Sequence, residues 1–489
     1  MSTPLSPPPG GADRTDHIGG RARGMLLVLC GAIFLEGIDV AMLNVALPSI
    51  RADLGLTTGS LSWVMSSYIL GYGGFMLLGG RAADLLGRRR MFLAWLGVFV
   101  VFSGLGGFAT EGWVLVVARF VTGVASAFMA PAGLSIITTN FAEGPRRNRA
   151  LLVYAGTAAA GFSLGLVVGG LLATVSWRWV FFAPVILASA ILLAALALIP
   201  GDSRPPRSTG GFDLAGAITV TGAMFALVFA VVRLEDPGSG WGWTVAALAA
   251  GLVLLAAFTA IERRSAAPLI RLGILRSGPL VRANLGALLF GGSFFGFQFL
   301  VVLYLQELRG WSSLQAALAL LVVGIDAVLA PTLTPRLVNR FGNVRVILGG
   351  LCLAAVAYAL FLPVGLDWTY AAMFPTMLLL GLAFALAYGP LTIAATDGVP
   401  EREQGVAGGL LYTSFQFGSA LGLSAATAVN VAATGAGGSL LAGLDGFRAA
   451  LFVPVVMVVA GAAIMVSGLR GRTGSGGTRH RTPVVAEAG

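Results

Sequence analysis

Long apolar stretches follow one another along almost the whole chain, and only short polar connections separate them. An α-helix needs about 20 mostly apolar residues to cross the roughly 30 Å hydrocarbon core of a bilayer. Of the 489 residues, 57% are hydrophobic and only 11% are charged, which exceeds what the core of a soluble protein of this size requires. The sequence therefore predicts an all-α polytopic membrane protein.

The apolar stretches predict fourteen transmembrane helices. We place them at residues 25–48, 62–80, 91–109, 112–135, 150–172, 180–200, 213–233, 243–261, 283–305, 314–334, 344–364, 370–393, 405–430 and 447–468. Six of them occupy residues 25–200 and six occupy residues 283–468, with an extra pair at residues 213–261 between these units. The ends, residues 1–24 and 470–489, are polar tails that we expect to be disordered.

Arginine is the only strongly basic residue in the chain, and its 31 copies are unevenly placed. If the N-terminus lies inside the cell, 25 of them fall in the two tails and in the connections that face the cytoplasm. Such an excess of basic residues marks the cytoplasmic side of a membrane protein. We therefore expect both termini in the cytoplasm and the chain in the cytoplasmic membrane. The net charge of +10 then reflects orientation rather than binding to nucleic acid.

The residue inventory excludes several function classes. The chain contains no Lys, so it cannot form a G-x-x-x-x-G-K-[ST] phosphate loop, and its longest internal connections, 201–212 and 262–282, leave no room for an ATP-binding domain. The only histidines, His17 and His480, lie in the tails, which excludes a buried imidazole relay and argues against a membrane-embedded enzyme. The two cysteines lie inside apolar stretches, where they suit packing, so no metal site is expected. Proton chemistry inside the membrane must therefore use carboxylates.

Glu36 and Asp39 lie three residues apart inside the first apolar stretch, so they share one face of a helix. An ionised acid at the membrane centre costs roughly 2.5–3.5 kcal/mol or more, so both should face the bundle interior or water. Burial and mutual repulsion favour the protonated form, and such an acid can exchange its proton for a cation. Arg119, in the fourth stretch, is a fixed charge that can pair with or tune one acid. The alternative is a structural role, with the carboxyl groups satisfied by the backbone or by Arg119.

Other polar and aromatic side chains inside the predicted spans are candidates for substrate binding. Asp326 lies in the middle of the tenth span, where an acid has a functional role by default. Aromatic walls with a few polar groups suit lipophilic ligands. The remaining candidates are Asn44 in the first span, Phe294, Phe297 and Gln298 in the ninth, and Tyr412 and Gln416 in the thirteenth. The alternatives are a Phe stripe that faces core or lipid, and a water-exposed Asp326 near a cavity wall.

A basic turn recurs at equivalent places in the two six-helix units, which indicates internal duplication. Its members after the second span are Gly80, Asp84, Gly87, Arg88 and Arg89, and a weaker copy covers residues 335–342 after the tenth span. Charge pairs at a helix boundary can hold two bundles in one of two arrangements. We therefore assign the first turn to conformational gating, with a solvated basic loop as the alternative.

The fifth predicted span carries a stripe of small residues. Gly161, Gly165 and Gly169 recur every four residues, and Gly170 lies beside them. This spacing permits close helix contact. We expect helix packing here, either as a sliding seam between the two halves or as plain packing.

At these residues the chain resembles the major facilitator superfamily, and more closely its fourteen-helix drug:proton antiporter subfamily, over essentially the whole length outside the tails. The turn after the second span matches the loop signature G-x-L-a-D-r-x-G-r-[kr]. Residues 39–48 are similar to the signature L-D-x-T-x-V-N-V-A-L-P, although Ala41 replaces the usual Thr. Arg119 and Gly123 stand where the element l-x-x-x-R-x-x-x-G places them, and residues 177–179 match the W-R-W entry to the sixth helix.

The resemblance implies two six-helix bundles with an inserted helix pair, which export lipophilic, cationic drugs or antibiotics by proton antiport and alternating access. It implies Asp39, Glu36 and Arg119 as proton-coupling residues, with the proton as coupling ion and no other cofactor. We expect a monomer whose partners are a small lipophilic substrate, protons and membrane lipids. One departure keeps an alternative open, because Leu166 replaces the Pro of the antiporter signature G-x-x-x-G-P-x-x-G-G on helix 5. That alternative is a proton-coupled importer or a facilitator of a small nutrient on the same fold.

Overall fold

The computed structural model describes residues 20–473, apart from residues 142–144, 202–212, 234–240, 266–267, 269–272, 274–275, 398, 400 and 435–439. Its elements are α1 (Gly20–Leu54), α2 (Thr58–Leu86), α3 (Arg88–Gly107), α4 (Gly112–Asn140), α5 (Pro145–Val175), α6 (Trp179–Leu198), α7 (Leu214–Val232), α8 (Trp241–Arg264), α9 (Gly278–Leu303), the π-helical turn η4 (Tyr304–Leu308), α10 (Ser313–Leu321), the 3₁₀ turn η5 (Val322–Ile325), α11 (Asp326–Thr332), α12 (Thr334–Phe341), α13 (Asn343–Phe361), α14 (Tyr370–Thr396), α15 (Glu401–Thr434), α16 (Leu440–Ala450) and α17 (Phe452–Thr473). The predicted tails lie outside the described residues except at 20–24 and 470–473, which are helical rather than disordered.

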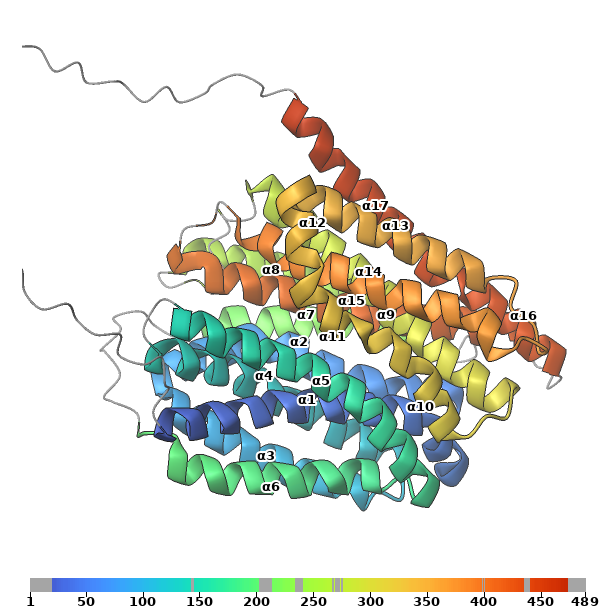
Figure 1. Cartoon of the computed structure of the whole chain (residues 1–489), viewed down its shortest axis with the longest axis horizontal. Coiled ribbons are helices and arrows are strands. Elements are labelled where there is room, and N and C mark those ends of the chain that lie inside the picture. Colours follow the sequence, from blue (N-terminus) through green and yellow to red (C-terminus); the bar gives the residue numbers. More distant parts are fainter. Residues whose placement is uncertain are drawn as a thin grey trace, which may run out of the picture.

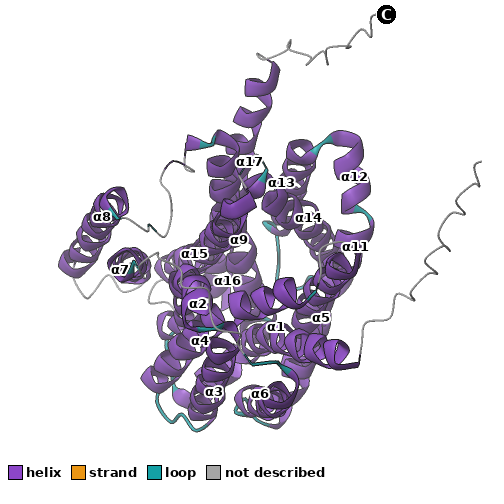
Figure 2. Ribbon diagram, turned by 90° about the vertical axis from the view of Figure 1, so that its left-hand side faces the viewer, coloured by secondary structure: helices purple, strands orange, loops and turns teal. Residues whose placement is uncertain are grey.

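The long helices run side by side as one bundle. Helices α1 to α6 lie together, α9 to α17 lie together, and α7 and α8 lie at one side (Figures 1 and 2). The same packing pairs recur in both groups, since α1 packs on α5 as α9 packs on α15, and α3 packs on α6 as α13 packs on α17. Such recurrence is what internal duplication produces. We call the two groups the first and second halves; the predicted domain boundaries remain predictions.

Twelve helical segments in the described part of the chain are long and apolar enough to cross a membrane. They correspond to all of the predicted spans except those in α2 and α7. These two elements are helices of 29 and 19 residues and pack against each other. Helix α1 begins and α17 ends at the same end of the bundle (Figure 1), as an even number of crossings requires. The structure therefore shows a multi-pass helical membrane protein, and the count of fourteen spans stays a prediction.

Two predicted features differ from the structure. The tenth span, predicted as one helix over residues 314–334, is broken into α10, η5 and α11, where Gly324 lowers helix propensity. The two basic connections are largely helical, because α2 continues to Leu86 and α12 covers Thr334–Phe341. The chain turns at Gly87 and Gly342, whose φ angles of 103° and 84° only glycine adopts without strain.

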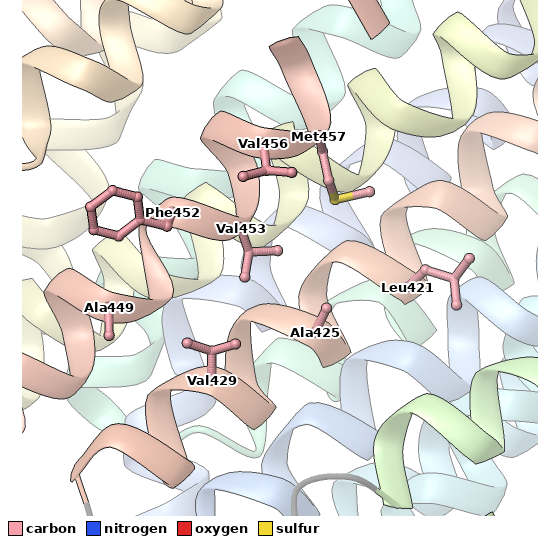
Figure 3. A pocket seen from close by; sticks show the side chains of 8 residues that line it. All are labelled: Leu421, Ala425, Val429, Ala449, Phe452, Val453, Val456 and Met457. Atoms are coloured by element: carbon pink, nitrogen blue, oxygen red, sulfur yellow. The ribbon is translucent and has the colours of Figure 1, made fainter. Parts of the chain in front are cut away.

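A groove of about 420 Å³ lies between α15 and the pair α16 and α17 (Figure 3). Its lining is apolar throughout and consists of Leu421, Ala425, Val429, Ala449, Phe452, Val453, Val456 and Met457. Phe452 and Val456 are 56% and 63% exposed, so the groove opens on the surface of the bundle. Because it contains no acid, we do not assign the transport site to it.

Candidate transport site

An ion pair lies buried inside the first half. Nη1 of Arg119 on α4 donates to Oδ2 of Asp39 on α1 at 2.6 Å, and each side chain is 2% exposed. The guanidinium carbon lies 4.2 Å from the centroid of the Tyr68 ring on α2. Arg119 Nε has no hydrogen-bond partner within the described residues. Arg119 therefore neutralises Asp39 in this conformation and keeps one donor for a further group.

Glu36, one helical turn before Asp39, has a different partner. Its Oε2 accepts a hydrogen bond of 2.7 Å from the hydroxyl of Tyr72 on α2. The Tyr72 ring in turn lies 5.1 Å from the ring of Tyr412 on α15, so this contact joins the two halves. Glu36 is 6% exposed, and no arginine of the described chain forms an ion pair with it. The two acids predicted to act together thus occupy separate environments, one neutralised and one not.

A close approach of two helices explains how Arg119 reaches Asp39. A Cβ atom on Gly123 of α4 would overlap the carbonyl of Tyr68 on α2, so glycine lets the two backbones touch there. Arg119 lies one turn before Gly123 and is thereby brought over the Tyr68 ring. The Tyr68 hydroxyl donates to Ser126 at 3.0 Å, which holds the ring in place.

The glycine stripe of α5 packs against α1. Cβ atoms on Gly161, Gly165 and Gly169 would meet the α1 backbone at Phe34, Ile38 and Met42, respectively. These three glycines therefore pack within the first half, where they set the position of the α1 acids, and do not form a seam between the halves. Gly170 differs, because its neighbours are Ala317 and Ser313 of α10 in the second half.

Asn44 and Gln298 meet across the two halves. Nδ2 of Asn44 on α1 donates to Oε1 of Gln298 on α9 at 3.4 Å, and both side chains are 1% exposed. Oδ1 of Asn44 and Nε2 of Gln298 have no hydrogen-bond partner in the described part of the structure. Buried amides are normally satisfied. This pair can therefore offer one hydrogen-bond acceptor and one donor to a ligand between the halves.

Tyr412 and Gln416 lie on the seam between α15 and α2. The Cβ atom of Gln416 is 3.0 Å from the position that a Cβ on Gly73 would occupy, directly beside Tyr72.

Tyr68 and Tyr72 were not among the predicted site residues, although their spacing could have indicated them. The two tyrosines lie four residues apart in the second predicted span and so share one face of its helix.

The two candidate phenylalanines of α9 have different surroundings. Phe294 belongs to an aromatic cluster that includes Phe384, at 4.7 Å between centroids, and Tyr388. Phe297 is fully buried and packs on Tyr358 and Phe361 at 4.8 and 5.3 Å. The structure therefore places Phe297 in the core of the second half, which is the alternative that the pattern left open, and does not bring it to the acids.

Asp326 begins α11 directly after the 3₁₀ turn η5 and is partly exposed. The turn lies between the halves, because Gly324 contacts Ser163 of α5 and the Val323 carbonyl contacts Gly381 of α14. A 3₁₀ segment in the middle of a transmembrane helix often marks a hinge. Asp326 therefore lies at the break between η5 and α11 in the second half, apart in sequence and in element from the acids of α1.

The predicted gating residues surround the turn between α2 and α3. Nη1 of Arg88 lies 3.5 Å from the carbonyl of Ser135 on α4, and Nη2 of Arg89 donates to the carbonyl of Leu196 on α6 at 2.9 Å. Gly80 faces Pro131 of α4. The side chain of Asp84 lies outside the described residues. These contacts join the turn to α4 and α6 of its own half, and gating by it stays a prediction.

The chemistry of the site follows from two acids, one arginine and several tyrosine hydroxyls. These groups can take up and release protons and can bind a cation. Within the described residues, no three His, Cys, Asp or Glu side chains are grouped as a metal site would need.

Comparison with known proteins identifies the family. The model of the Major Facilitator Superfamily matches residues 29–423. The chain belongs to this superfamily. This major facilitator protein is 36% identical over 427 residues to the cephamycin export protein of Amycolatopsis lactamdurans, covering 85% of each chain. It is 34% identical over 424 residues to the puromycin resistance protein of Streptomyces alboniger, covering 84% of this chain and 82% of that one.

Solved structures of other transporters share the fold. The peptide transporter PepTSo has a TM-score of 0.68 at 15% identity, covering 93% of this chain and 99% of that one. A bacterial homologue of the human lysosomal transporter Spinster has a TM-score of 0.66 at 17% identity, covering 93% and 98%. The predicted major facilitator fold is therefore confirmed, and the family makes this chain a transporter. Its assignment to the fourteen-helix subfamily stays a prediction.

Proposed function

We propose that this transporter exports lipophilic, cationic small molecules across the cytoplasmic membrane by proton antiport and alternating access. The observation that carries the proposal is the buried ion pair of Asp39 and Arg119, with Glu36 one turn away. Two relatives, at 36% and 34% identity, are named for export of and resistance to antibiotics, which supports export. Fourteen spans with both termini in the cytoplasm belong to the same proposal, supported by the arginine distribution.

The charges of the three residues suit an exchange of one proton for one cation. With both acids ionised, Glu36, Asp39 and Arg119 together carry one negative charge, which a monovalent cationic substrate neutralises. When a proton binds one acid from outside, the site becomes neutral and the cation is no longer favoured. When that proton leaves to the cytoplasm, the negative charge returns. The site therefore favours either the proton or the cationic substrate at one time, and this is the condition for antiport.

The surroundings of Glu36 suit the cationic group of the substrate. Asp39 is already neutralised by Arg119, whereas Glu36 accepts only the Tyr72 hydroxyl among its hydrogen-bond partners in the described structure. A buried carboxylate without a counter-charge is costly, so Glu36 must bind a proton or a cation. The rings of Tyr72 and Tyr412 add aromatic faces from both halves, which attract organic cations.

Proteoliposomes with an acidic interior and a trapped pH dye test the direction of coupling. When ethidium is added outside, an antiporter accumulates it as protons leave, so the internal pH rises faster than in protein-free liposomes. A proton-coupled importer moves both species in the same direction, and a facilitator moves no protons. A lack of internal pH change while ethidium equilibrates would contradict antiport.

The rival function, a nutrient importer or facilitator, is favoured by Leu166. This residue is fully buried in the core shared by α1, α5 and the second half, and α5 runs unbroken from Pro145 to Val175. The antiporter subfamily that this chain resembles has a proline here, and a proline would bend the helix at this position. The pH assay above distinguishes them, because the sign of the pH change separates an antiporter from a proton-coupled importer and its absence identifies a facilitator.

Asp326→Asn is expected to weaken transport of cationic substrates selectively. An acid at the break between η5 and α11 attracts a cation, so its neutralisation should lower transport of ethidium by about ten-fold, equivalent to about 1.4 kcal/mol. Transport of a neutral lipophilic dye should change little. Asp397→Asn, which removes an exposed acid at the end of α14 in the same half, is the matched control. An equal loss for neutral and cationic dyes would refute this role for Asp326.

A further inference from the structure

The apolar groove between α15 and the pair α16 and α17 follows from the residues of its walls. Ala425 of α15 and Ala449 of α16 are small and leave space between the facing helices. Pro454 has no N–H to bond to the Ala450 carbonyl, so α16 ends at Ala450 and α17 begins at Phe452. One wall of the groove is therefore a continuous helix, and the other is interrupted.

The groove runs along the helices from the end that α16 occupies toward the middle of the bundle. Val429, Ala449 and Phe452 lie at one end of it, and Leu421 and Met457 lie at the other (Figure 3). Leu421 and Val429 are eight residues apart, which corresponds to about 12 Å at the helical rise. One leaflet contributes about 15 Å, half of the hydrocarbon core of a bilayer. The groove therefore extends over most of one leaflet.

The groove opens toward the bilayer. Phe452 and Val456 are exposed, and in a membrane protein such apolar side chains face lipid. On the inner side, Met457 packs on Gly292 of α9 in the second half. Ordered water needs two or more polar partners, and the lining supplies no polar side chain. A hydrocarbon chain, by contrast, leaves no polar group unsatisfied there.

Arg448 lies at the α16 end of the groove, next to Ala449 and four residues before Phe452. Its Nε donates to the carbonyl of Val364 at 2.9 Å, which holds the guanidinium in place. Its Nη1 lies 3.9 Å from Oδ1 of Asp445, which is beyond hydrogen-bond distance, and the two side chains are 41% and 73% exposed. An exposed pair of this kind contributes at most about 1 kcal/mol. An anion can therefore replace Asp445 beside Arg448.

The orientation of the chain does not account for Arg448. With both termini in the cytoplasm, this arginine lies near the outer face, where no excess of basic residues is expected. Arg51 and Arg178 near the same face have acids at 2.5 and 2.8 Å. Arg448 has no acid as close within the described residues. Its planar guanidinium suits a phosphate group, which it can bind through two nitrogens.

We propose that the groove is a binding site for an anionic phospholipid, with one acyl chain between α15 and α17 and the phosphate group on Arg448. The lipid stays bound at the surface of the second half and is not the transported substrate. In the orientation given under the proposed function, it belongs to the outer leaflet. The site is separate from the pair of Asp39 and Arg119 and does not depend on proton antiport.

Photo-cross-linking locates the lipid. The full-length protein is reconstituted with a trace of phosphatidylglycerol that carries a diazirine at the end of one acyl chain, and the labelled peptides are identified by mass spectrometry. We expect label near Leu421 and Met457, about five-fold more than with the matching phosphatidylcholine, which is the preference that one basic residue gives. Label that is absent from both segments, or equal for the two lipids, would overturn the proposal.

Three variants test the phosphate contact in this assay. Arg448→Gln should lower the labelling by phosphatidylglycerol to the level of phosphatidylcholine. Asp445→Asn removes the competing carboxylate and should raise it about two-fold, since an exposed pair is weak. Arg178→Gln is the matched control, because Arg178 lies near the same face and is 34% exposed. Equal losses in Arg448→Gln and Arg178→Gln would show a general effect of surface charge and contradict the site.

Ala425→Phe tests the contact with the acyl chain. The larger side chain fills the groove, so the labelling by both lipids should fall to background. Ala249→Phe is the control, because it makes the same change at an exposed alanine of α8. Unchanged labelling in folded Ala425→Phe would overturn the acyl-chain contact. If this variant does not fold, Arg448→Gln still tests the site, because its side chain is exposed.

Two further outcomes would assign the groove to another occupant. If excess ethidium abolishes the labelling near Leu421, the groove takes the transported substrate. If Phe452→Cys, in a background with Cys30→Ala and Cys352→Ala, forms disulfide-linked dimers in membranes, a second copy of the chain covers the groove. Either result overturns the lipid site. Labelling as expected in a protein that moves no protons supports the lipid site and contradicts only the proposed antiport.

Discussion

Asp39→Asn is expected to reduce proton-driven ethidium transport to the rate of protein-free liposomes. An amide cannot take up and release a proton, so the charge of the site would no longer alternate between its two values. The amide oxygen can still accept a hydrogen bond from Arg119, which limits the structural cost. That cost stays below the roughly 3–5 kcal/mol of removing one partner of a buried ion pair altogether. Uphill transport in the proteoliposome assay, together with a thermal unfolding curve in detergent, separates lost coupling from lost folding.

Asp53→Asn is the control for this prediction. Asp53 also lies on α1 and also pairs with an arginine, but its side chain is 49% exposed at the end of the helix. The Asp53→Asn variant should transport ethidium at nearly the wild-type rate. Asp39→Glu keeps a proton-binding group and should retain measurable coupling. If Asp39→Asn still drives ethidium uphill at the wild-type rate, Asp39 is not the coupling acid, and Glu36→Gln and Asp326→Asn then decide which acid is.

Gly169→Val is expected to remove most of the folded protein. A Cβ atom on Gly169 would overlap the backbone of Met42 on α1, and backbone atoms cannot move aside as a flexible side chain can. The helices would have to separate, which costs about 1–3 kcal/mol or more for overpacking and draws Asp39 away from Arg119. The measurements are the yield of the monodisperse peak in size-exclusion chromatography and the melting temperature in detergent.

Gly156→Val on the same helix is the matched control. No atom lies within 4 Å of the position that a Cβ on Gly156 would occupy, and the residue is exposed. Valine also has a higher helix propensity than glycine, so the melting temperature should stay the same or rise slightly. Equal melting temperatures for the two variants would show that α5 does not need glycine to pack on α1.

Much of the fold follows from residues that are neighbours in sequence. The apolar stretches locate the long helices, because the length of a span depends only on local hydrophobicity and helix rise. The break at η5 and the π-helical turn at η4 were not foreseen. Gly324 weakens the helix locally, and tertiary neighbours lie at both places, since Gly324 meets Ser163 and Tyr304 is held by Gly365 and Phe447.

The candidate site likewise combines residues that the sequence predicts with partners that it does not predict. The charges of Glu36, Asp39 and Arg119 inside the membrane could be predicted from the amino-acid sequence, because an intramembrane charge stands out against its apolar surroundings. The pairing of Asp39 with Arg119, 80 residues away, and of Glu36 with Tyr72 becomes visible only when the helices are packed together. Helix packing also places Asn44 next to Gln298, 254 residues away, and Phe297 in the core of the second half. The partner of a buried side chain depends on how closely two helices approach each other. Glycines on the facing helix permit that approach, and the local periodicity of the sequence does not reveal it.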